Sequence, residues 1–313
     1  MLKVAIENSY TTQKTSIDEF GARLFMQGIL KKNDIELTRI SLNKLNSKTL
    51  TFKEYYTLDK NWKSKRISGE YKPDIIRSRR WAWTYYKYSL LENQYKIISS
   101  KKVSIISNDK YENYLFLKKH QPKTYLLKTF FYEHKNLLLS SKIVIKPIRA
   151  SWGKGIELTT TEELMNNRDK FIGLEELFIV QEFKDFSKWY PWIVEWNHDI
   201  RLMLAWKDII EVTLRIPEKW NFKSNIWSWW TQSTLPKKVL PKELLNLSKK
   251  IYKELDLQWD DIMSMDFAYC KEDNKRYLIE INASPGTRYY QTDKKALLGI
   301  CLWLVKFFKK LKK

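Results

Sequence analysis

Cysteine and histidine are scarce in this chain of 313 residues. It has two cysteines, Cys270 and Cys301, and three histidines, too few for a zinc site or a disulfide framework. The sequence offers no Cys–His or Ser–His pairing that would supply a covalent nucleophile. We therefore expect any metal to be bound by oxygen ligands, and the cysteine usage fits a reducing cytoplasm.

Long uncharged apolar runs are also missing. No stretch approaches the roughly 20 apolar residues of a membrane-spanning helix. The first residues, Met1 to Glu7, predict a strand, so we expect no signal peptide. Internal repeats and low-complexity linkers are likewise not found. The sequence predicts a soluble cytoplasmic protein without a membrane span.

The balance of charge is strongly positive. The chain has 57 Lys and Arg against 36 Asp and Glu, a net charge of +21. Hydrophobic residues make up 43% and charged residues 30%, which is typical of a globular protein, and the length favours two or three lobes. The excess of lysine favours an acidic partner, such as nucleic acid, anionic lipid, an acidic peptide or nucleotide phosphates. A lysine-rich solvated surface is the alternative.

Strands at 2–6 and 35–40 flank a predicted helix at 16–32, the start of a parallel α/β layer. The segment 43–70 has no clear pattern. Further along, the sequence predicts a strand over 74–77, a helix from the aromatic run 81–88 to about Glu92, a strand over 103–106, and a helix over 107–119.

Oxygen-bearing side chains gather on two strands late in the sequence. Glu280 and Asn282 stand two residues apart in an apolar strand, so their side chains face the same side. Asp266 lies in another strand-like run, Ile262 to Tyr269. This set consists of hard oxygen ligands, which suit Mg²⁺ bridging nucleotide phosphates.

A glycine-containing loop follows the predicted buried strand Ile143 to Pro147, which carries Lys146 near its end. The loop reads Ser151-Trp152-Gly153-Lys154-Gly155. Glycines let backbone N–H groups close around phosphate oxygens, and lysines add charge. A strand, Ile156 to Leu158, follows instead of a helix. The pattern therefore favours a hairpin lid over a dinucleotide-binding or P-loop site.

These patterns resemble, in order, the motifs of the ATP-grasp ligases, and most closely those of the ribosomal-protein glutamate ligases. Glu280-x-Asn282-x-Ser284-Pro285-Gly286 is the first match. Lys146 with its glycine loop is the second. Further matches are Asp109-Lys110, Glu182-Phe183, Asp199-Ile200-Arg201 and Phe222-Lys223-Ser224-Asn225. They extend over about two-thirds of the chain.

The resemblance implies an α/β ATP-grasp fold with α+β lobes. An N-terminal parallel α/β domain would span residues 1–106, a central lid subdomain 107–182, and a C-terminal subdomain with the metal site 183–313. Mg²⁺ or Mn²⁺ would be held by Asp266, Glu280 and Asn282, and catalysis would depend on Arg201, Arg215 and Asn225. The residues implied to hold ATP are Lys110, Lys146, Ser151, Gly153, Gly155, Gln181, Glu182, Phe183, Asp199, Lys223, Ser224 and Asn225.

The implied reaction joins a carboxylate to an amine through an acyl phosphate formed from ATP. Two segments depart from the family pattern. The link 184–198 is expanded and carries Trp189, Tyr190, Trp192 and Trp196, and Trp227, Trp229 and Trp230 follow Asn225. Such aromatic walls can stack a cation, a ring or a peptide, or form a core patch between lobes. With the positive charge, they favour an acidic peptide or protein as acceptor and an amino acid or other amine as the second substrate.

Three alternatives stay open on the sequence. The first is a tubulin-tyrosine-ligase-like enzyme, since those enzymes share the Lys-Pro, Asp-x-Arg and Ile-Glu-Ile-Asn motifs. The second is a peptide-crosslinking ligase, which would use the same chemistry. A basic nucleic-acid-binding protein with an inactive nucleotide site belongs to another class. The helix over 293–313 is expected to pack in the core, with a membrane-surface helix as the alternative, and a homo-oligomer is left open.

Overall fold

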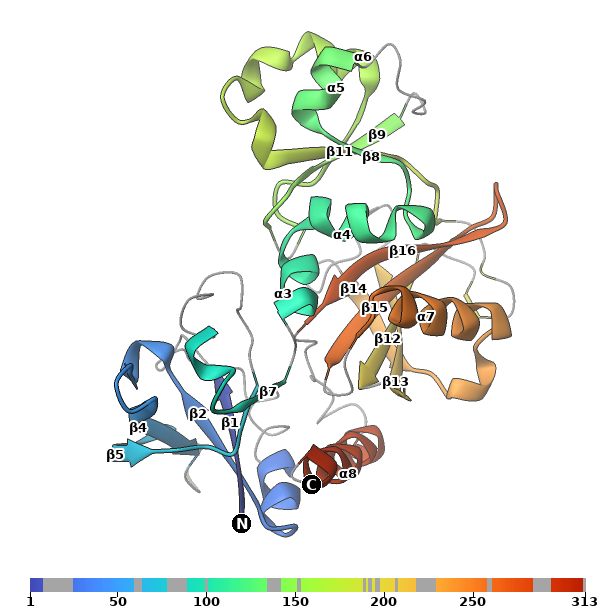
Figure 1. Cartoon of the computed structure of the whole chain (residues 1–313). Coiled ribbons are helices and arrows are strands. Elements are labelled where there is room, and N and C mark those ends of the chain that lie inside the picture. Colours follow the sequence, from blue (N-terminus) through green and yellow to red (C-terminus); the bar gives the residue numbers. More distant parts are fainter. Residues whose placement is uncertain are drawn as a thin grey trace.

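The computed structural model describes residues 1–7, 25–58, 64–77, 89–98, 101–133, 142–150, 153–187, 190, 193–194, 198–205, 208–217, 229–257, 261–283 and 294–311. Its strands form three sheets, of seven, four and five strands. Figure 1 shows them in three lobes, with the first sheet at lower left, the third in the middle right and the second at the top. The mixed architecture of helices and sheets in separate lobes is the one predicted.

The first sheet contains the parallel layer predicted for the start of the chain. Strand β1 pairs in parallel with β2 and β6, and β6 with β7. A hairpin of β4 and β5 adds antiparallel strands beyond β2, and residues 25–31 are helical. The strand bounds are β1 Leu2–Glu7, β2 Ile35–Ile40, β3 Leu45–Asn46, β4 Thr51–Leu58, β5 Ser64–Tyr71, β6 Ile75–Arg77 and β7 Lys96–Ile98, with a 3-10 turn at Leu42–Lys44.

The second sheet forms the small upper lobe. Its order is β10-β9-β11-β8, and every pairing is antiparallel. The core lies between this sheet and α5, where Phe130 and Phe131 meet Ile143, Ile145 and Val180. The elements are β8 Thr124–Leu126, α5 Leu127–Glu133, β9 Lys142–Pro147, β10 Glu157–Thr160, α6 Thr161–Asn166, β11 Phe178–Glu182 and the 3-10 turns Arg168–Phe171 and Glu175–Leu177.

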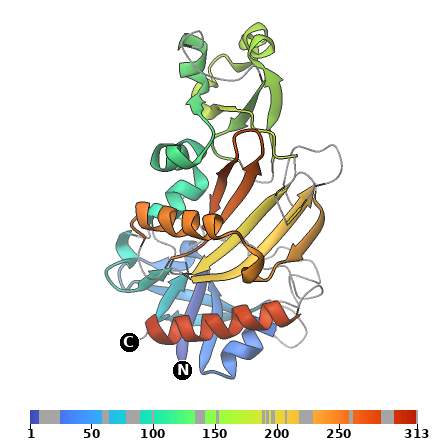
Figure 2. The ribbon, with the colours of Figure 1, turned by 90° about the vertical axis from the view of Figure 1, so that its right-hand side faces the viewer.

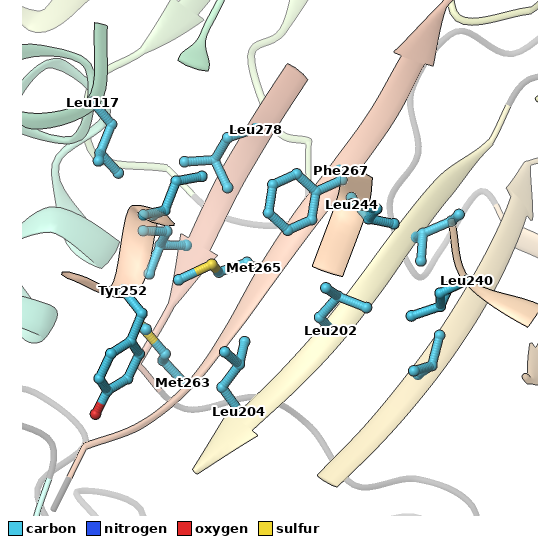
Figure 3. Packing of buried hydrophobic residues seen from close by; sticks show 14 of the residues in the cluster. Leu117, Leu202, Leu204, Leu240, Leu244, Tyr252, Met263, Met265, Phe267 and Leu278 are labelled. Atoms are coloured by element: carbon cyan, nitrogen blue, oxygen red, sulfur yellow. The ribbon is translucent and has the colours of Figure 1, made fainter. Parts of the chain in front are cut away.

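The third sheet is antiparallel in the order β14-β13-β12-β15-β16. Helices α3, α4 and α7 supply apolar residues to one of its faces. Figure 3 shows part of this core, with Phe267, Met265 and Met263 of β15 among leucines of the neighbouring elements. The elements are α3 Lys101–Asn108, α4 Lys110–Leu117, β12 Asp199–Ala205, β13 Asp208–Pro217, β14 Trp229–Thr234, α7 Lys242–Glu254, β15 Ile262–Cys270 and β16 Lys275–Asn282, with 3-10 turns Lys118–His120 and Lys237–Val239.

Helix α8, Lys294–Leu311, joins the first and third lobes. Its apolar residues pack with Leu2, Val4 and Ile75 of the first sheet and with Met203 and Ile262 of the third. Figure 2 shows the helix lying across the lower part of the molecule, beside the N-terminal strands. The prediction that this helix packs in the core is confirmed. No helix among the described residues is long and apolar enough to cross a membrane.

One prediction of secondary structure is wrong. Residues 103–106 belong to helix α3, not to a strand. Val103 and Ile106 are buried three residues apart, which is the helical period, and Ser107 Oγ and Asn108 Nδ2 donate to the Ser104 carbonyl. The segment 43–70 contains β3, β4 and most of β5, where the sequence shows no clear pattern.

Candidate active site

The polar face of the third sheet carries most of the predicted site. Met263, Met265 and Phe267 of β15 point into the core (Figure 3), so the alternating residues Ser264 and Asp266 point to the opposite face. At one end α8 covers this face. At the other end charged residues lie on four neighbouring strands, and the register aligns them as Arg215 opposite Asp199, Arg201 opposite Asp266, and Asp266 opposite Glu280.

Two arginines share the buried carboxylate of Asp266. Arg201 donates Nε to Asp266 Oδ1 at 2.8 Å and Nη2 to Oδ2 at 2.6 Å. Arg215 Nη2 also donates to Asp266 Oδ2 at 2.6 Å. Arg215 in addition binds both oxygens of Asp199, at 2.5 and 2.6 Å. The four side chains therefore form one network of two cations and two anions.

Within the network the arginines oppose the effect of burial on the two carboxylates. Burial raises the pKa of Asp199 to about 6, against the opposing charge of Arg215. Burial acts in the same direction on Asp266, but Arg201 and Arg215 outweigh it and lower the pKa of that carboxyl. For Arg201, burial is outweighed by the charge of Asp266, which raises the pKa of the guanidinium. The two arginines thus favour the charged form of both aspartates.

A β-bulge sets the position of Glu280. The β15–β16 register changes between the pairs Asp266–Glu280 and Phe267–Leu278, so that Ile279 is one extra residue. Leu278 and Ile281 consequently both reach the core, while Glu280 and Asn282 face the other side. Asn282 Nδ2 lies 3.4 Å from Glu280 Oε2. The predicted proximity of Asp266, Glu280 and Asn282 is present in the structure.

Two lysines approach this face, Lys110 from the start of α4 and Lys146 from β9 of the second lobe. Lys110 Nζ donates to the carbonyl of Ala150 at 2.5 Å, next to the predicted lid loop. Lys146 Nζ donates to Gln181 Oε1 at 2.6 Å, and Gln181 Nε2 donates to Thr124 Oγ1 at 2.8 Å. Gln181, predicted to hold ATP, therefore positions a lysine here. The supporting hydroxyl of Thr124 is not among the predicted site residues.

The lysines and Glu280 interact electrostatically. The pKa of Lys146 is lowered to about 8, mainly by burial and also by the charge of Lys110, while Glu280 opposes both effects. Burial also lowers the pKa of Lys110, again opposed by Glu280. Because the charges of Lys110 and Glu280 both act on Lys146, the second and third lobes bring cations and a carboxylate together between them.

The glycine loop has the backbone that its sequence predicts. Gly153 and Gly155 adopt φ angles of 67° and 69°, a region that residues with a Cβ rarely occupy. A Cβ at Gly155 would lie 2.8 Å from Pro147 Cγ. This close approach holds the loop against the end of β9, beside Lys146. Ser151 lies outside the described residues.

Strand β11 carries the predicted ATP contacts Gln181 and Glu182, and the third-sheet lobe follows it. Glu182 N donates to the Lys123 carbonyl and Phe183 N to the Lys142 carbonyl. The Glu182 carboxylate lies 3.2 Å from Lys184 Nζ, which also lies 3.4 Å from Asp273. Lys184, which the sequence motifs did not single out, therefore lies next to the predicted nucleotide contact Glu182.

Several predicted residues lie outside the described part of the chain. They are Lys223, Ser224 and Asn225, together with Trp189, Trp192, Trp196 and Trp227. Trp229 and Trp230 begin β14, but their side chains are not described. Tyr190 is buried, accepts a hydrogen bond from Arg276 Nε at 3.0 Å, and packs against Tyr269 and His198. This one member of the aromatic insertion is a core residue.

The donor set fits a divalent cation. Glu280 and Asn282 are partly exposed and offer oxygen donors, which suit hard cations. A carboxylate has about four acceptor positions, and three bonds from the two arginines are described at Asp266, so it retains acceptor capacity. Among the described residues no group of three His, Cys, Asp and Glu side chains could hold a metal.

Comparison with known proteins agrees with this geometry. Residues 118–301, more than half of the chain, match the RimK-like ATP-grasp domain family. No curated protein matches the sequence.

Solved structures share the fold over almost their full lengths. A RimK domain ATP-grasp protein from Sphaerobacter thermophilus is 12% identical, with a TM-score of 0.58 over 98% of this chain and 99% of that one. The D-alanine–D-alanine ligase of Bacillus anthracis is 15% identical, with a TM-score of 0.60 over 100% of both chains. The ATP-grasp ligase PsnB, complexed with a minimal precursor, is 12% identical, with a TM-score of 0.59 over 100% and 99%. The chain therefore belongs to the RimK-like ATP-grasp family and is an amide-bond-forming ligase.

Proposed function

We propose that this ligase uses ATP and Mg²⁺ to activate a carboxylate as an acyl phosphate, and that its acceptor is an acidic peptide or protein. The observation that carries the proposal is the convergence of Lys110 and Lys146 on Glu280, beside the Asp266–arginine network. Phosphoryl transfer needs this combination of positioned cations and metal-binding carboxylates.

In the first step an oxygen of the substrate carboxylate attacks the γ-phosphorus of ATP, and the bond to the β-phosphate oxygen breaks. ADP leaves and an acyl phosphate forms. Lys110 and Lys146 neutralise the phosphates, while Arg201, which is partly exposed, faces the new acyl phosphate. Buried Arg215 holds Asp266 and Asp199 in place, so we assign it a supporting role.

In the second step the amine attacks the carbonyl carbon, and inorganic phosphate leaves as the amide forms. The positive charge of Arg201 stabilises the oxygens of the departing phosphate. Asp266, Glu280 and Asn282 would hold Mg²⁺, which when bound neutralises β- and γ-phosphate charge. The glycine loop would cover the phosphates and exclude water, which would otherwise hydrolyse the acyl phosphate.

Charge supports a macromolecular acidic acceptor. The chain carries +21, and neutralising ATP accounts for only a small part of this excess. A broad positive surface raises the local concentration of an acidic chain. The acceptor would gain an amino acid or be crosslinked within itself, since both products come from the same acyl phosphate.

Mass spectrometry tests the proposal. The protein is incubated with ATP, Mg²⁺, mixed amino acids and a glutamate-rich peptide, and ADP release is followed in parallel. A mass gain of one or more residues supports ligation, and the loss of one water with ADP release supports crosslinking. If only free amino acids or other small carboxylates are joined, the ligase chemistry stands and the peptide acceptor is wrong.

A further inference from the structure

Ser264 occupies a central position that the proposed reaction does not use. It lies in β15, two residues before Asp266, on the polar face of the sheet. In the β15–β16 ladder it stands directly opposite Asn282. Residues opposite each other in an antiparallel pair have Cβ atoms about 4.5–5.5 Å apart. The Ser264 hydroxyl and the Asn282 amide are therefore close enough to form a hydrogen bond.

The Ser264 hydroxyl is buried and has no hydrogen-bond partner within the described structure. Ser264 is 0% exposed. Buried polar atoms are almost always satisfied, and an exception calls for an explanation, such as a role in another state of the site. A second observation at Asn282 indicates what that role is.

The Asn282 amide has a weak partner in this structure. Its Nδ2 lies 3.4 Å from Glu280 Oε2, beyond the usual 2.7–3.2 Å range of N–H···O bonds. A cation takes the oxygen of an amide and the oxygens of a glutamate, so Glu280 would no longer be a free acceptor for the amide N–H group. The buried Ser264 Oγ can then accept this hydrogen bond.

We propose that Ser264 is a positioning residue for the metal of the ATP complex. Its Oγ accepts a hydrogen bond from Asn282 Nδ2 and thereby directs Asn282 Oδ1 toward the cation that Glu280 also holds. The inference rests on the proposed function, because it assumes that this set binds the metal–nucleotide complex. Hydrogen bonds of this kind orient the groups that bind a metal directly.

The test is binding of Mn²⁺ in the presence of a non-hydrolysable ATP analogue, measured from the electron paramagnetic resonance signal of free Mn²⁺. Ser264→Ala is expected to weaken Mn²⁺ binding about 10- to 100-fold, the usual effect of losing such a supporting hydrogen bond. Ser248→Ala is the matched control. Ser248 is equally buried but lies in α7, where its Oγ donates to the Leu245 carbonyl at 2.9 Å. This variant should bind Mn²⁺ like the wild type.

A double-mutant cycle identifies the residue through which Ser264 acts. If it acts through Asn282, Ser264→Ala combined with Asn282→Ala should bind Mn²⁺ as weakly as Asn282→Ala alone. If the two losses multiply, Ser264 acts independently of Asn282 and the inference is overturned.

Thermal unfolding without ligands separates this role from ordinary packing. Ser264→Ala removes an unpartnered buried hydroxyl, so its unfolding midpoint should equal or exceed that of the wild type, whereas Ser248→Ala should unfold at a lower temperature. A large drop in the Ser264→Ala midpoint would assign the hydroxyl a structural role and contradict the inference. If Ser264→Ala binds Mn²⁺ as tightly as the wild type, this inference is overturned and the proposed function is unaffected. If the wild type itself binds no Mn²⁺ with the analogue, the proposed function fails first.

Discussion

The charged side chains on the polar face of the third sheet have different roles. Asp266 is buried between Arg201 and Arg215, and Asp199 completes the group by holding Arg215. Removing one member of such a network would leave a buried charge without its partner, which is strongly destabilising. Glu280 is different, because it is partly exposed and its neighbours are lysines rather than arginines. It is the better position for testing metal binding without unfolding the protein.

Glu280→Gln should reduce magnesium-dependent ADP release by more than about 100-fold, because a metal ion contributes several kcal/mol to the transition state. The substitution keeps the shape and removes one charge, so the circular dichroism spectrum and the unfolding midpoint should stay close to those of the wild type. Turnover of ATP at the wild-type rate would mean that Glu280 is not a metal ligand.

Lys146 should make ATP binding depend on pH. Its pKa of about 8 in the folded protein means that it loses its positive charge between pH 7 and pH 9. ATP affinity measured by calorimetry should then fall on the order of tenfold across this range. Lys146→Arg is the control, since guanidinium stays charged, and its affinity should vary much less with pH. An equal pH dependence in both proteins would point to another titrating group.

Titration of Lys146 should also change stability with pH, and the change is opposite to that of ATP affinity: stability rises as the pH rises. The ordinary pKa of a lysine is 10.5, and the pKa of folded Lys146 is about 8, so between these pH values the unfolded chain binds more protons than the folded one. The free energy of unfolding of the ATP-free protein should therefore gain a contribution from Lys146 that increases with pH over this window. In Lys146→Arg this contribution should be missing, and denaturant unfolding at pH 8 and pH 10 compares the two.

At the scale of elements, buried strands were predictable and irregular ones were not. Strand β9 is a short apolar run and β2 alternates apolar with polar residues, and the bounds of both agree with the prediction to within a residue. The hairpin of β4 and β5 is exposed along much of β5, and its sequence lacks clear alternation of apolar and polar residues. The bulge at Ile279 could not be predicted, because one isoleucine among apolar neighbours does not show that it has no partner in the register.

The candidate site was predictable only in part. The Glu280-x-Asn282 spacing correctly predicts a shared face, which needs only strand geometry. The hydrogen bond between Gln181 and Lys146 depends on which strands become neighbours in the second sheet. The order of strands in a sheet cannot be read from the sequence. The same holds for Thr124, whose hydroxyl lies across from Gln181 in the β8–β11 pair.

The glycine loop gives a prediction at this scale. Gly155→Ala should raise the KM for ATP by about tenfold or more, because its Cβ would meet Pro147 at 2.8 Å and move the loop off β9, and small displacements near a reacting group cost rate. Gly173→Ala is the matched control. Gly173 has a similar φ of 76°, but no heavy atom lies within 4 Å of the point that a Cβ would occupy there.

Both glycine variants should therefore lose about 1 kcal/mol of stability from backbone strain, while only Gly155→Ala changes the steady-state kinetics with ATP. Equal KM values for the two variants would show that the loop is an ordinary hairpin.

At the scale of the whole molecule, the net charge of +21 predicts a salt-sensitive reaction. The kcat/KM for a glutamate-rich peptide should fall steeply between low salt and about 0.2 M, since exposed charges are screened over about 10 Å at 0.1 M ionic strength. A peptide with glutamine in place of the flanking glutamates is the control, and its kcat/KM should change little. Equal salt dependence for the two peptides would remove the electrostatic argument for an acidic acceptor.

Helix α8 has a consequence for how the chain reaches its native state. The apolar side of the first sheet, which includes Leu2 and Val4, packs against Leu304 and other residues of α8, and nearly the whole sequence separates the two. During synthesis the N-terminal strands therefore emerge long before the helix that covers them. Until α8 docks, their apolar surface is available to other chains, and such exposure promotes aggregation. Folding of the first lobe should accordingly depend on a late closing step between distant parts of the sequence, which is slow for topological reasons.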